Sequence, residues 1–158
     1  MKTMTKPMRR MINTAIVYFA LAMCAGIFYR EFTKAFAYTG PTPLKAVHAH
    51  LLILGMLLFL VLALFCQNNP QLTDCNSFAC FYVIYNISLP IMALCLLTRG
   101  VLAVEHATPN RIVDATISGI AGLSHIGLAV ALILLFVAIK RRMPVESSDQ
   151  QDCTAHRS

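Results

Sequence analysis

The sequence predicts an all-α integral membrane protein with four transmembrane helices, and three observations lead to this fold class. Of the 158 residues, 58% are hydrophobic and 13% are charged, and the mean hydropathy is +0.67. Soluble domains carry about 25% charged residues, so an ordinary cytoplasmic globule is excluded. Four uncharged runs are each about as long as the 20 residues that cross a bilayer. Basic residues flank these runs instead of forming the continuous basic face that nucleic acid requires.

The first predicted span covers residues 11–29 and contains no charged residue. Its 19 residues exceed the apolar core of about 7–15 residues that is typical of a cleavable signal peptide. We therefore expect a retained helix. Four basic residues precede it, namely Lys2, Lys6, Arg9 and Arg10.

The second and third spans are bounded by turn-forming residues. The second span covers residues 46–66, and Pro41 and Pro43 precede it where proline commonly opens a helix. The third span covers residues 77–97. The sequence Gln67-Asn68-Asn69-Pro70 separates the two and predicts a turn, because proline and asparagine interrupt helices.

The fourth span covers residues 115–139, and we expect Thr108 and Pro109 to form its N-cap and first turn. Residues 1–142 then make up one transmembrane domain. Residues 143–158 are polar and mixed in charge, so we expect a disordered C-terminal tail.

Both ends of the membrane domain are basic, and this predicts its orientation. An even number of spans places the two ends on one side of the membrane, and the run Lys140-Arg141-Arg142 matches the basic N-terminal segment. Positive flanks favour the cytoplasmic side, so both termini are predicted to be cytoplasmic. Five basic residues remain for the outer side: Arg30, Lys34, Lys45, Arg99 and Arg111.

Three of the five histidines lie inside predicted spans, where ionisable side chains are costly and indicate functional sites. His48 and His50 lie near the outer start of the second span, and His125 lies in the fourth. Counting back about 20 residues from Lys140 places the outer end of the fourth hydrocarbon-spanning segment near Ile120. All three histidines therefore lie at a similar depth, which favours a shared site.

The spacing of His48 and His50 limits the chemistry of that site. Side chains two residues apart on an α-helix point about 200° apart, so one helix directs these two imidazoles at two different sites. A zinc hydrolase is disfavoured, because it places histidines four residues apart with a carboxylate between them. The six cysteines form no Cys-x-x-Cys pair. Axial ligation of haem, with one histidine from each of two helices, fits the spacing better.

The surroundings of His125 allow two interpretations. Ser118, Ala121 and Gly122 lie three to seven residues upstream on the same helical face. Small residues allow a second backbone or a flat ring to approach closely, which suits a ligand site. Ordinary helix packing, with His125 hydrogen-bonded to a neighbouring helix, explains the pattern equally well.

The basic residues on the outer side gain a role if the ligand is haem. Arg30 and Arg99 lie at the outer ends of the first and third spans, where each could pair bidentately with a haem propionate. Lys34 and Lys45 are looser candidates, and binding of lipid headgroups explains them equally well. In the third span, we expect Asn86 to make an interhelical hydrogen bond.

Three segments carry a resemblance to a known family. They are residues 18–34 (YFALAMCAGIFYREFTK), 47–57 (VHAHLLILGML) and 118–128 (SGIAGLSHIGL). These segments resemble a family of small four-helix bacterial membrane proteins that is known only as a domain of unknown function. The resemblance covers roughly residues 11–142 and implies a multi-pass protein of the bacterial plasma membrane. It implies no activity.

A second resemblance lies in His48-Ala49-His50, which Leu51 and Gly55 follow. This segment is similar to a haem-ligand helix of haem-copper oxidase catalytic subunits and their nitric-oxide-linked relatives. Those subunits have twelve helices in three arcs of four, and the two imidazoles of one His-x-His serve different haems. The resemblance implies that three copies of this chain form a homotrimer, because a cyclic trimer closes such contacts. Each haem b would be held by His48 of one protomer and His50 of the next.

The same resemblance limits the reaction. The chain lacks the linked His–Tyr motif of the oxidases, and it has no obvious set of three copper-ligating histidines unless His125 contributes. Copper therefore stays a secondary possibility. Oxygen reduction is not implied, and whether the protein is an enzyme stays open.

The leading interpretation is a b-type haem protein that transfers electrons, or that binds or senses a diatomic gas such as O2 or NO. A respiratory-chain protein would be its redox partner, and membrane lipid and further copies of the chain would surround it. Two alternatives stay open. One is a metal-ion or proton transporter that uses His48, His50 and His125. The other is a cofactor-free accessory subunit of a respiratory complex.

Overall fold

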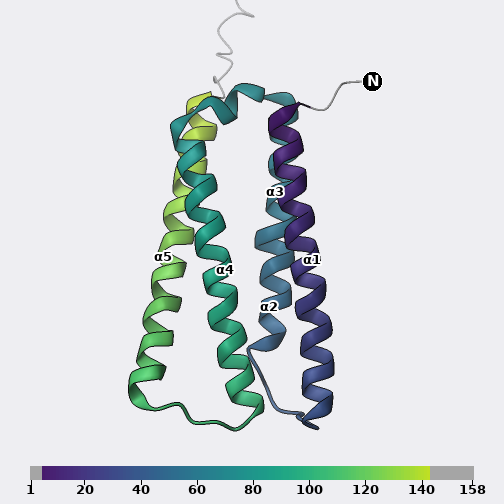
Figure 1. The fold of residues 1–158 in the computed structure, drawn as a ribbon. Helices are drawn as coiled ribbons and strands as arrows, with labels where there is room; N and C mark the ends of the chain where they lie inside the picture. The colour runs from purple at the N-terminus through teal and green to yellow at the C-terminus, as the bar shows by residue number, and fades with distance from the viewer. Residues whose placement is uncertain (1–4, 143–158) are drawn as a thin grey trace, which may run out of the picture.

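The computed structural model describes residues 5–142, and the long helices in this part of the chain form two antiparallel hairpins (Figure 1). The predicted disordered tail, residues 143–158, lies outside the described residues. The first hairpin consists of α1 (Lys6–Ala35) and a second span made of α2 (Leu44–His50), the π-helix η1 (Leu51–Leu57) and α3 (Leu58–Asn68). The 3-10 turn η2 (Pro70–Asp74) leads to the second hairpin, which consists of α4 (Asn76–Val104) and α5 (Arg111–Arg142).

Each predicted span lies inside one of four helical segments that are long and apolar enough to cross a membrane. The prediction of an all-helical protein with four such helices is therefore confirmed for the described residues. We call the end of the bundle that contains Lys6 and Arg142 the terminal end, and the end with the two connections 36–43 and 105–110 the opposite end (Figure 1).

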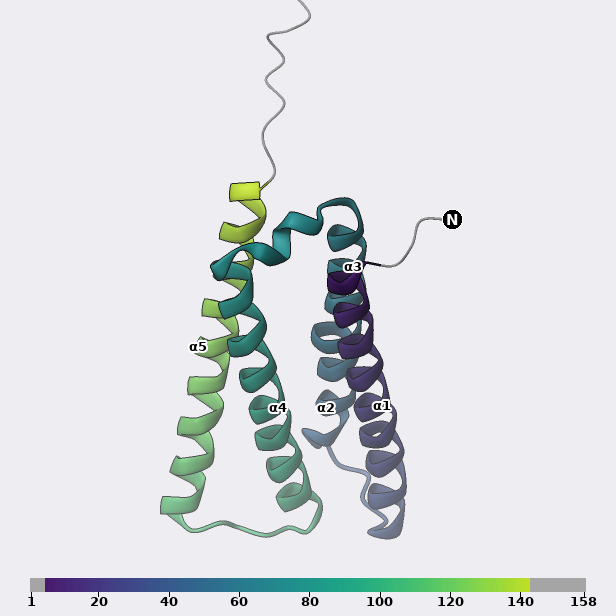
Figure 2. The same cartoon turned by 45° about the horizontal axis from the view of Figure 1, so that its top comes forward.

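The two hairpins meet in different ways at the two ends of the bundle. At the terminal end, η2 runs across from one hairpin to the other (Figures 1 and 2). Toward the opposite end, α2 packs on α4, and Leu44 fills the space beside Gly100, where an added Cβ would lie 2.5 Å from the Leu44 side chain. In the described part of the chain, α5 packs mainly on α4 and η2.

An aromatic cluster joins α1, α3 and α4 in the core. Phe59 and Tyr85 are fully buried, and Phe59 stacks on Tyr18 with a centroid distance of 5.7 Å. The Tyr18 hydroxyl donates a hydrogen bond to Asn86 Oδ1 over 3.0 Å. The predicted interhelical hydrogen bond of Asn86 is therefore confirmed.

The π-helix η1 directly follows His50 and determines which residues of the second span face the core. Leu51, Gly55 and Phe59 are buried and recur every four residues, whereas an α-helix repeats every 3.6. The wider π turn keeps these three residues on one side of the helix. Gly55 is required there, because an added Cβ would lie 2.5 Å from Tyr18 Cγ. The Tyr85 hydroxyl donates to the Leu54 carbonyl within this segment over 2.8 Å.

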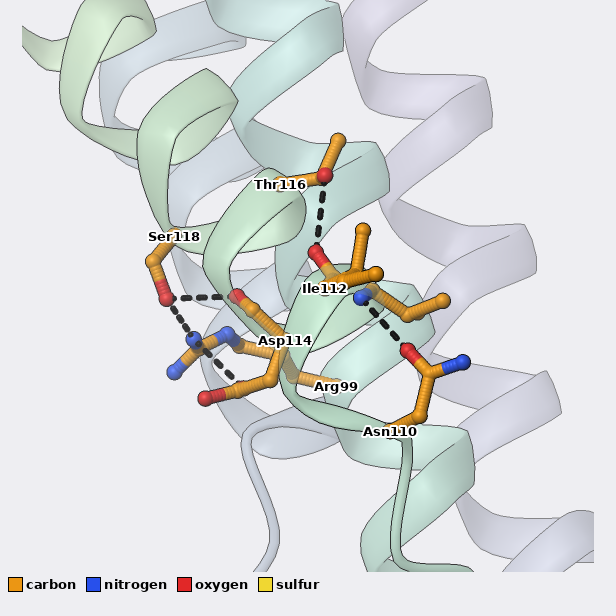
Figure 3. Close-up of polar contacts among 7 residues, drawn as sticks. Arg99, Asn110, Ile112, Asp114, Thr116 and Ser118 are labelled. Carbon is orange, nitrogen blue, oxygen red and sulfur yellow. Dashed lines mark hydrogen bonds and ion pairs between the residues drawn. The ribbon is translucent and has the colours of Figure 1, made fainter.

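The helix starts agree with the sequence in one case and differ in another. Pro43 is the N-cap of α2, as expected from its position. The expected N-cap of the fourth span at Thr108 and Pro109 is wrong, because α5 begins at Arg111. Asn110 caps this helix instead, since its side-chain Oδ1 accepts a hydrogen bond from the Val113 backbone N–H over 2.9 Å (Figure 3).

Candidate functional site

His48 lies between its own helix and α1, where a backbone carbonyl and a glycine hold its ring. Its Nδ1 lies 2.7 Å from the carbonyl oxygen of Ala22, and the side chain is partly buried. The ring lies against Gly26, where an added Cβ would lie 3.0 Å from Nδ1. Gly26 therefore provides the space in which the imidazole reaches α1.

This contact fixes the tautomer of His48. A carbonyl oxygen only accepts hydrogen bonds, so Nδ1 carries the proton and donates it to Ala22. In the neutral imidazole, Nε2 then carries the lone pair, which remains for another partner. Histidines that ligate metals are oriented in this way, with the second ring nitrogen donating to a carbonyl or carboxylate.

His50 lies on a different flank of α2. Its Nδ1 lies 2.7 Å from the carbonyl oxygen of Ala46, one turn earlier on the same helix, and its side chain is partly buried. Because His48 contacts α1 and the two residues are about 200° apart, His50 lies on the flank turned away from α1. The two imidazoles thus lie in different surroundings, each with Nε2 free of a carbonyl partner.

His125 has the same type of bond on α5 but an exposed side chain. Its Nδ1 lies 2.7 Å from the carbonyl oxygen of Ala121 on its own helix. The alternative in which His125 bonds to a neighbouring helix is therefore not what the structure shows. An exposed imidazole at this depth is unfavourable against lipid, since polar side chains within a membrane normally face protein or water.

The three histidines lie within overlapping stretches of the bundle, with α4 as the common reference. Leu44 packs on Gly100 and the Tyr85 hydroxyl reaches the Leu54 carbonyl, so α2 from His48 to His50 lies between the levels of these two α4 residues. On the other side of α4, Arg99 bonds to Ser118 and Ser88 contacts Gly127. His125 lies between those two levels, which overlap the first range.

One face of α5 carries exposed residues that are mostly small, and among them Ser118 has a side-chain partner on another helix, Arg99 of α4. It consists of Ala115, Ser118, Gly122, His125 and Ala129, all of which are exposed. An added Cβ at Gly122 would meet no atom within 4 Å, and the same holds for Gly119. By contrast, an added Cβ at Gly127 would collide with Ser88. Packing within the chain therefore explains Gly127 but not Gly119 or Gly122. We call the five exposed residues listed above the α5 small-residue face.

A single chain does not assemble a complete metal site in the part that the structure describes. No group of three or more His, Cys, Asp or Glu side chains comes together between residues 5 and 142. His48 lies at α1, whereas His125 lies on α5, and these helices belong to different hairpins. Any ligand with two histidine partners from these positions would have to bridge separate surfaces.

The two arginines proposed for the outer side both have acidic neighbours, and Figure 3 shows those of Arg99. Arg99 on α4 donates to Asp114 Oδ1 over 3.3 Å and to Ser118 Oγ over 2.6 Å on α5. Arg30 Nε lies 3.8 Å from Glu31 Oε1, and both side chains are exposed. Lys34 and Lys45 are exposed and form no ion pair within the described residues.

Sequence reasoning missed the residues of α1 that hold His48. Ala22 and Gly26 are small and uncharged, so nothing in their chemistry marks a role. The available signal is their four-residue spacing, which places both on one face of α1 and allows a neighbouring helix to approach closely.

Comparisons with known proteins gave one match. A family model described as protein of unknown function (DUF2871) matches residues 8–142. The searches of curated proteins and of solved structures returned no match.

Proposed function

Because the chain belongs to the DUF2871 family, whose description states no activity, we propose its function from the site: a b-type haem-binding membrane protein for electron transfer or for binding or sensing O2 or NO. One observation carries this proposal. The imidazole of His48 is held by the Ala22 carbonyl at Nδ1, which leaves the Nε2 lone pair for an axial bond.

The same pairing at His50 supplies a second ligand of the same kind. The two imidazoles leave α2 on different flanks, so they suit two separate haems better than one. We therefore propose that each haem is held by His48 of one protomer and His50 of the next. Bound haem would supply a reversible one-electron couple, and two histidine ligands would favour electron transfer over gas binding.

A homotrimer is the assembly proposed for this arrangement. Two observations support contact with further copies of the chain. The α5 small-residue face is exposed within the chain, and it carries an imidazole at membrane depth. A second copy placed on this face would remove His125 from lipid and bring a backbone close to Gly122. The number three comes from the resemblance to the twelve-helix oxidases.

The remaining residues of the site would surround the bound haem. Arg99 lies at the opposite end, close to the level of the histidines, and would pair with a propionate at the expense of Asp114. Arg30 would act in the same way from α1. His125 would lie beside the ligand, where it could bind a gas or copper if one axial histidine leaves.

We also propose that the protein lies in the bacterial plasma membrane with its terminal end in the cytoplasm. The charges of the described residues support this orientation. Six basic residues and one acidic residue, Asp74, lie at the terminal end, whereas Glu31, Glu105 and Asp114 accompany five basic residues at the opposite end. The basic bias toward the cytoplasm thus exceeds the bias outside.

An absorption spectrum of the protein purified in detergent tests the proposal. We expect a Soret band and a sharp α band after addition of dithionite. In the shared-ligand arrangement, His48→Ala and His50→Ala should each remove one axial ligand from every haem and change both bands. His106→Ala is the matched control, because His106 is exposed in the connection between α4 and α5.

Other outcomes would assign other functions. A colourless protein that binds zinc or copper through the three membrane histidines would support a metal-ion or proton transporter. A colourless protein that binds no metal would support an accessory subunit. If only one of the two alanine variants alters the spectrum, the ligand shared between protomers is wrong.

A further inference from the structure

A groove runs along the seam between α1 and α4, and its terminal end is basic. Here a cavity of about 460 Å³ is lined by Lys6, Arg9, Arg10, Asn13, Thr14 and Tyr82. A second cavity of about 260 Å³ shares Lys6, Arg10 and Tyr82 and extends toward η2. Both lie beside the first turns of α1, at the level where a spanning helix enters the membrane.

The basic residues of this groove have no acidic partner in the described part of the chain. The ion pairs found there join Arg30 to Glu31 and Arg99 to Asp114, both far from this end. Asp74 is the one acidic residue described at the terminal end, and it forms no ion pair with Lys6, Arg9 or Arg10. Among residues 5–142, the charge of the groove is thus left for a bound anion.

A cation–π contact with Tyr82 places the Arg10 guanidinium at the mouth of the groove. Its guanidinium carbon lies 3.8 Å from the centre of the Tyr82 ring. The Thr14 hydroxyl donates to the Arg10 carbonyl over 3.0 Å, and the Tyr82 hydroxyl lies 2.8 Å from Thr14 Oγ1. Since the hydrogen of Thr14 is used, Tyr82 donates to Thr14. The guanidinium over the Tyr82 ring keeps its N–H donors, which lie in the guanidinium plane, available for phosphate oxygens.

The groove continues from this basic mouth into the apolar part of the seam. A cavity of about 340 Å³ shares Thr14 and Tyr82 with the mouth and extends to Leu21 and Pro90. Side-chain bonds from Thr14 and Tyr18 to α4 cross the seam. From Arg10 to Leu21 the helix rises about 17 Å, which is close to half of a hydrocarbon core of about 30 Å.

We infer that this groove binds an anionic phospholipid of the leaflet at the terminal end, with its phosphate at Lys6, Arg9 and Arg10 and an acyl chain along Val17 and Leu21. Free phosphate would use the basic mouth alone. The apolar continuation, one leaflet deep, fits the acyl chain of a lipid. Basic pockets between transmembrane helices bind such headgroups.

The test is thermal unfolding of the full-length protein in neutral detergent with three additives. Phosphatidylglycerol should raise the melting temperature in a saturable way. Phosphatidylcholine, which is zwitterionic, and inorganic phosphate at equal concentration should have little effect. Protection by inorganic phosphate equal to that by phosphatidylglycerol would overturn the lipid assignment in favour of a free-anion site.

Two pairs of variants separate the specific groove from general attraction to negative lipid. Arg10→Gln removes a groove charge, and Arg141→Gln is its control, since Arg141 lies at the same end on α5. Phosphatidylglycerol should bind Arg10→Gln about fivefold more weakly, as expected for one basic residue at a membrane surface. Equal weakening in both variants would contradict the groove.

The second pair tests the acyl-chain part without changing charge. Val17→Trp fills the groove, and Val83→Trp adds the same bulk on the lipid-facing side of α4; the two valines are 57% and 54% exposed, so both variants should fold. Phosphatidylglycerol should protect Val83→Trp and should fail to protect Val17→Trp. Full protection of Val17→Trp would overturn the proposal. These melting curves are independent of whether haem binds.

Discussion

The three membrane histidines share a bond that their sequence pattern does not reveal. Each imidazole has Nδ1 at 2.7 Å from a backbone carbonyl, but only His48 uses a carbonyl from another helix. The histidines themselves are predictable, because ionisable residues stand out within apolar runs. Ala22 and Gly26 are not, since their role depends on the register of α1 against α2, which the sequence of either helix alone does not specify.

Gly26→Ala tests how much the position of the His48 ring depends on Gly26. The added Cβ would lie 3.0 Å from Nδ1, so the ring must move by a few tenths of an ångström. If His48 ligates haem, haem affinity should fall roughly tenfold, as for other losses around a ligating histidine. Haem titration measures it, with Gly119→Ala as the control because its Cβ would meet no atom within 4 Å. Unchanged haem affinity in Gly26→Ala would contradict a role of Gly26 in positioning His48.

Cys75 is a second residue whose chemistry depends on its position. It is the N-cap of α4, and a hydrogen bond from the Ser77 backbone lowers the pKa of its thiol, with the charge of Arg142 acting in the same direction. Because the thiolate is the reactive form, a lowered pKa makes Cys75 more reactive near neutral pH than an ordinary thiol.

The rate of maleimide labelling between pH 6 and pH 10 checks this expectation about Cys75. The rate should rise with pH and reach half of its maximum at a lower pH than for glutathione, because the pKa is lowered. Cys153 is replaced by serine in the protein used, and Cys75→Ser shows the background. A midpoint equal to or above that of glutathione would refute the prediction.

At the scale of the elements, composition was sufficient to predict the four spans but not their internal geometry. Long apolar runs such as residues 46–66 have to be helical in lipid, because every backbone polar group must be satisfied within the segment. The π-helix depends on which side of the run faces α1. Leu51, Gly55 and Phe59 give the available signal in their four-residue spacing, but the surrounding residues are apolar as well and obscure it.

Gly55→Ala probes this segment. The added methyl group would overlap Tyr18, whose ring is buried and stacked on Phe59. Overpacking of this kind costs about 1–3 kcal/mol. The free energy of unfolding in mixed detergent should fall by that amount relative to Gly119→Ala, whose Cβ has open space. An unchanged free energy would show that η1 adjusts without strain.

For the whole molecule, the most informative feature is that α5 packs mainly on α4 and is otherwise exposed. The sequence predicts that small residues gather around His125, but it leaves open whether they face α4 or another chain. The structure places Ser124 and Leu128 against α4 and leaves Gly122 and His125 exposed. This distinction depends on the rotation of α5 about its own axis, and both arrangements fit the same hydropathy.

Gly122→Leu tests whether this face joins two copies of the chain. Within one protomer the new side chain has open space, so the protomer should fold as before. If copies of the chain assemble through this face, the assembly should dissociate, which native mass spectrometry or light scattering in detergent would detect. Ile120→Phe is the control, because Ile120 is 46% exposed on another side of α5. Equal masses for both variants and the parent protein would rule this face out as the contact.

The arrangement of the hairpins also has a consequence for the order of synthesis. The two α1 residues that contact the His48 ring, Ala22 and Gly26, come earlier in the chain than the histidine itself. Ala22, Gly26 and His48 are therefore all synthesised within the first two membrane segments. The hydrogen bond of His48 to Ala22 therefore involves no residue of α4 or α5.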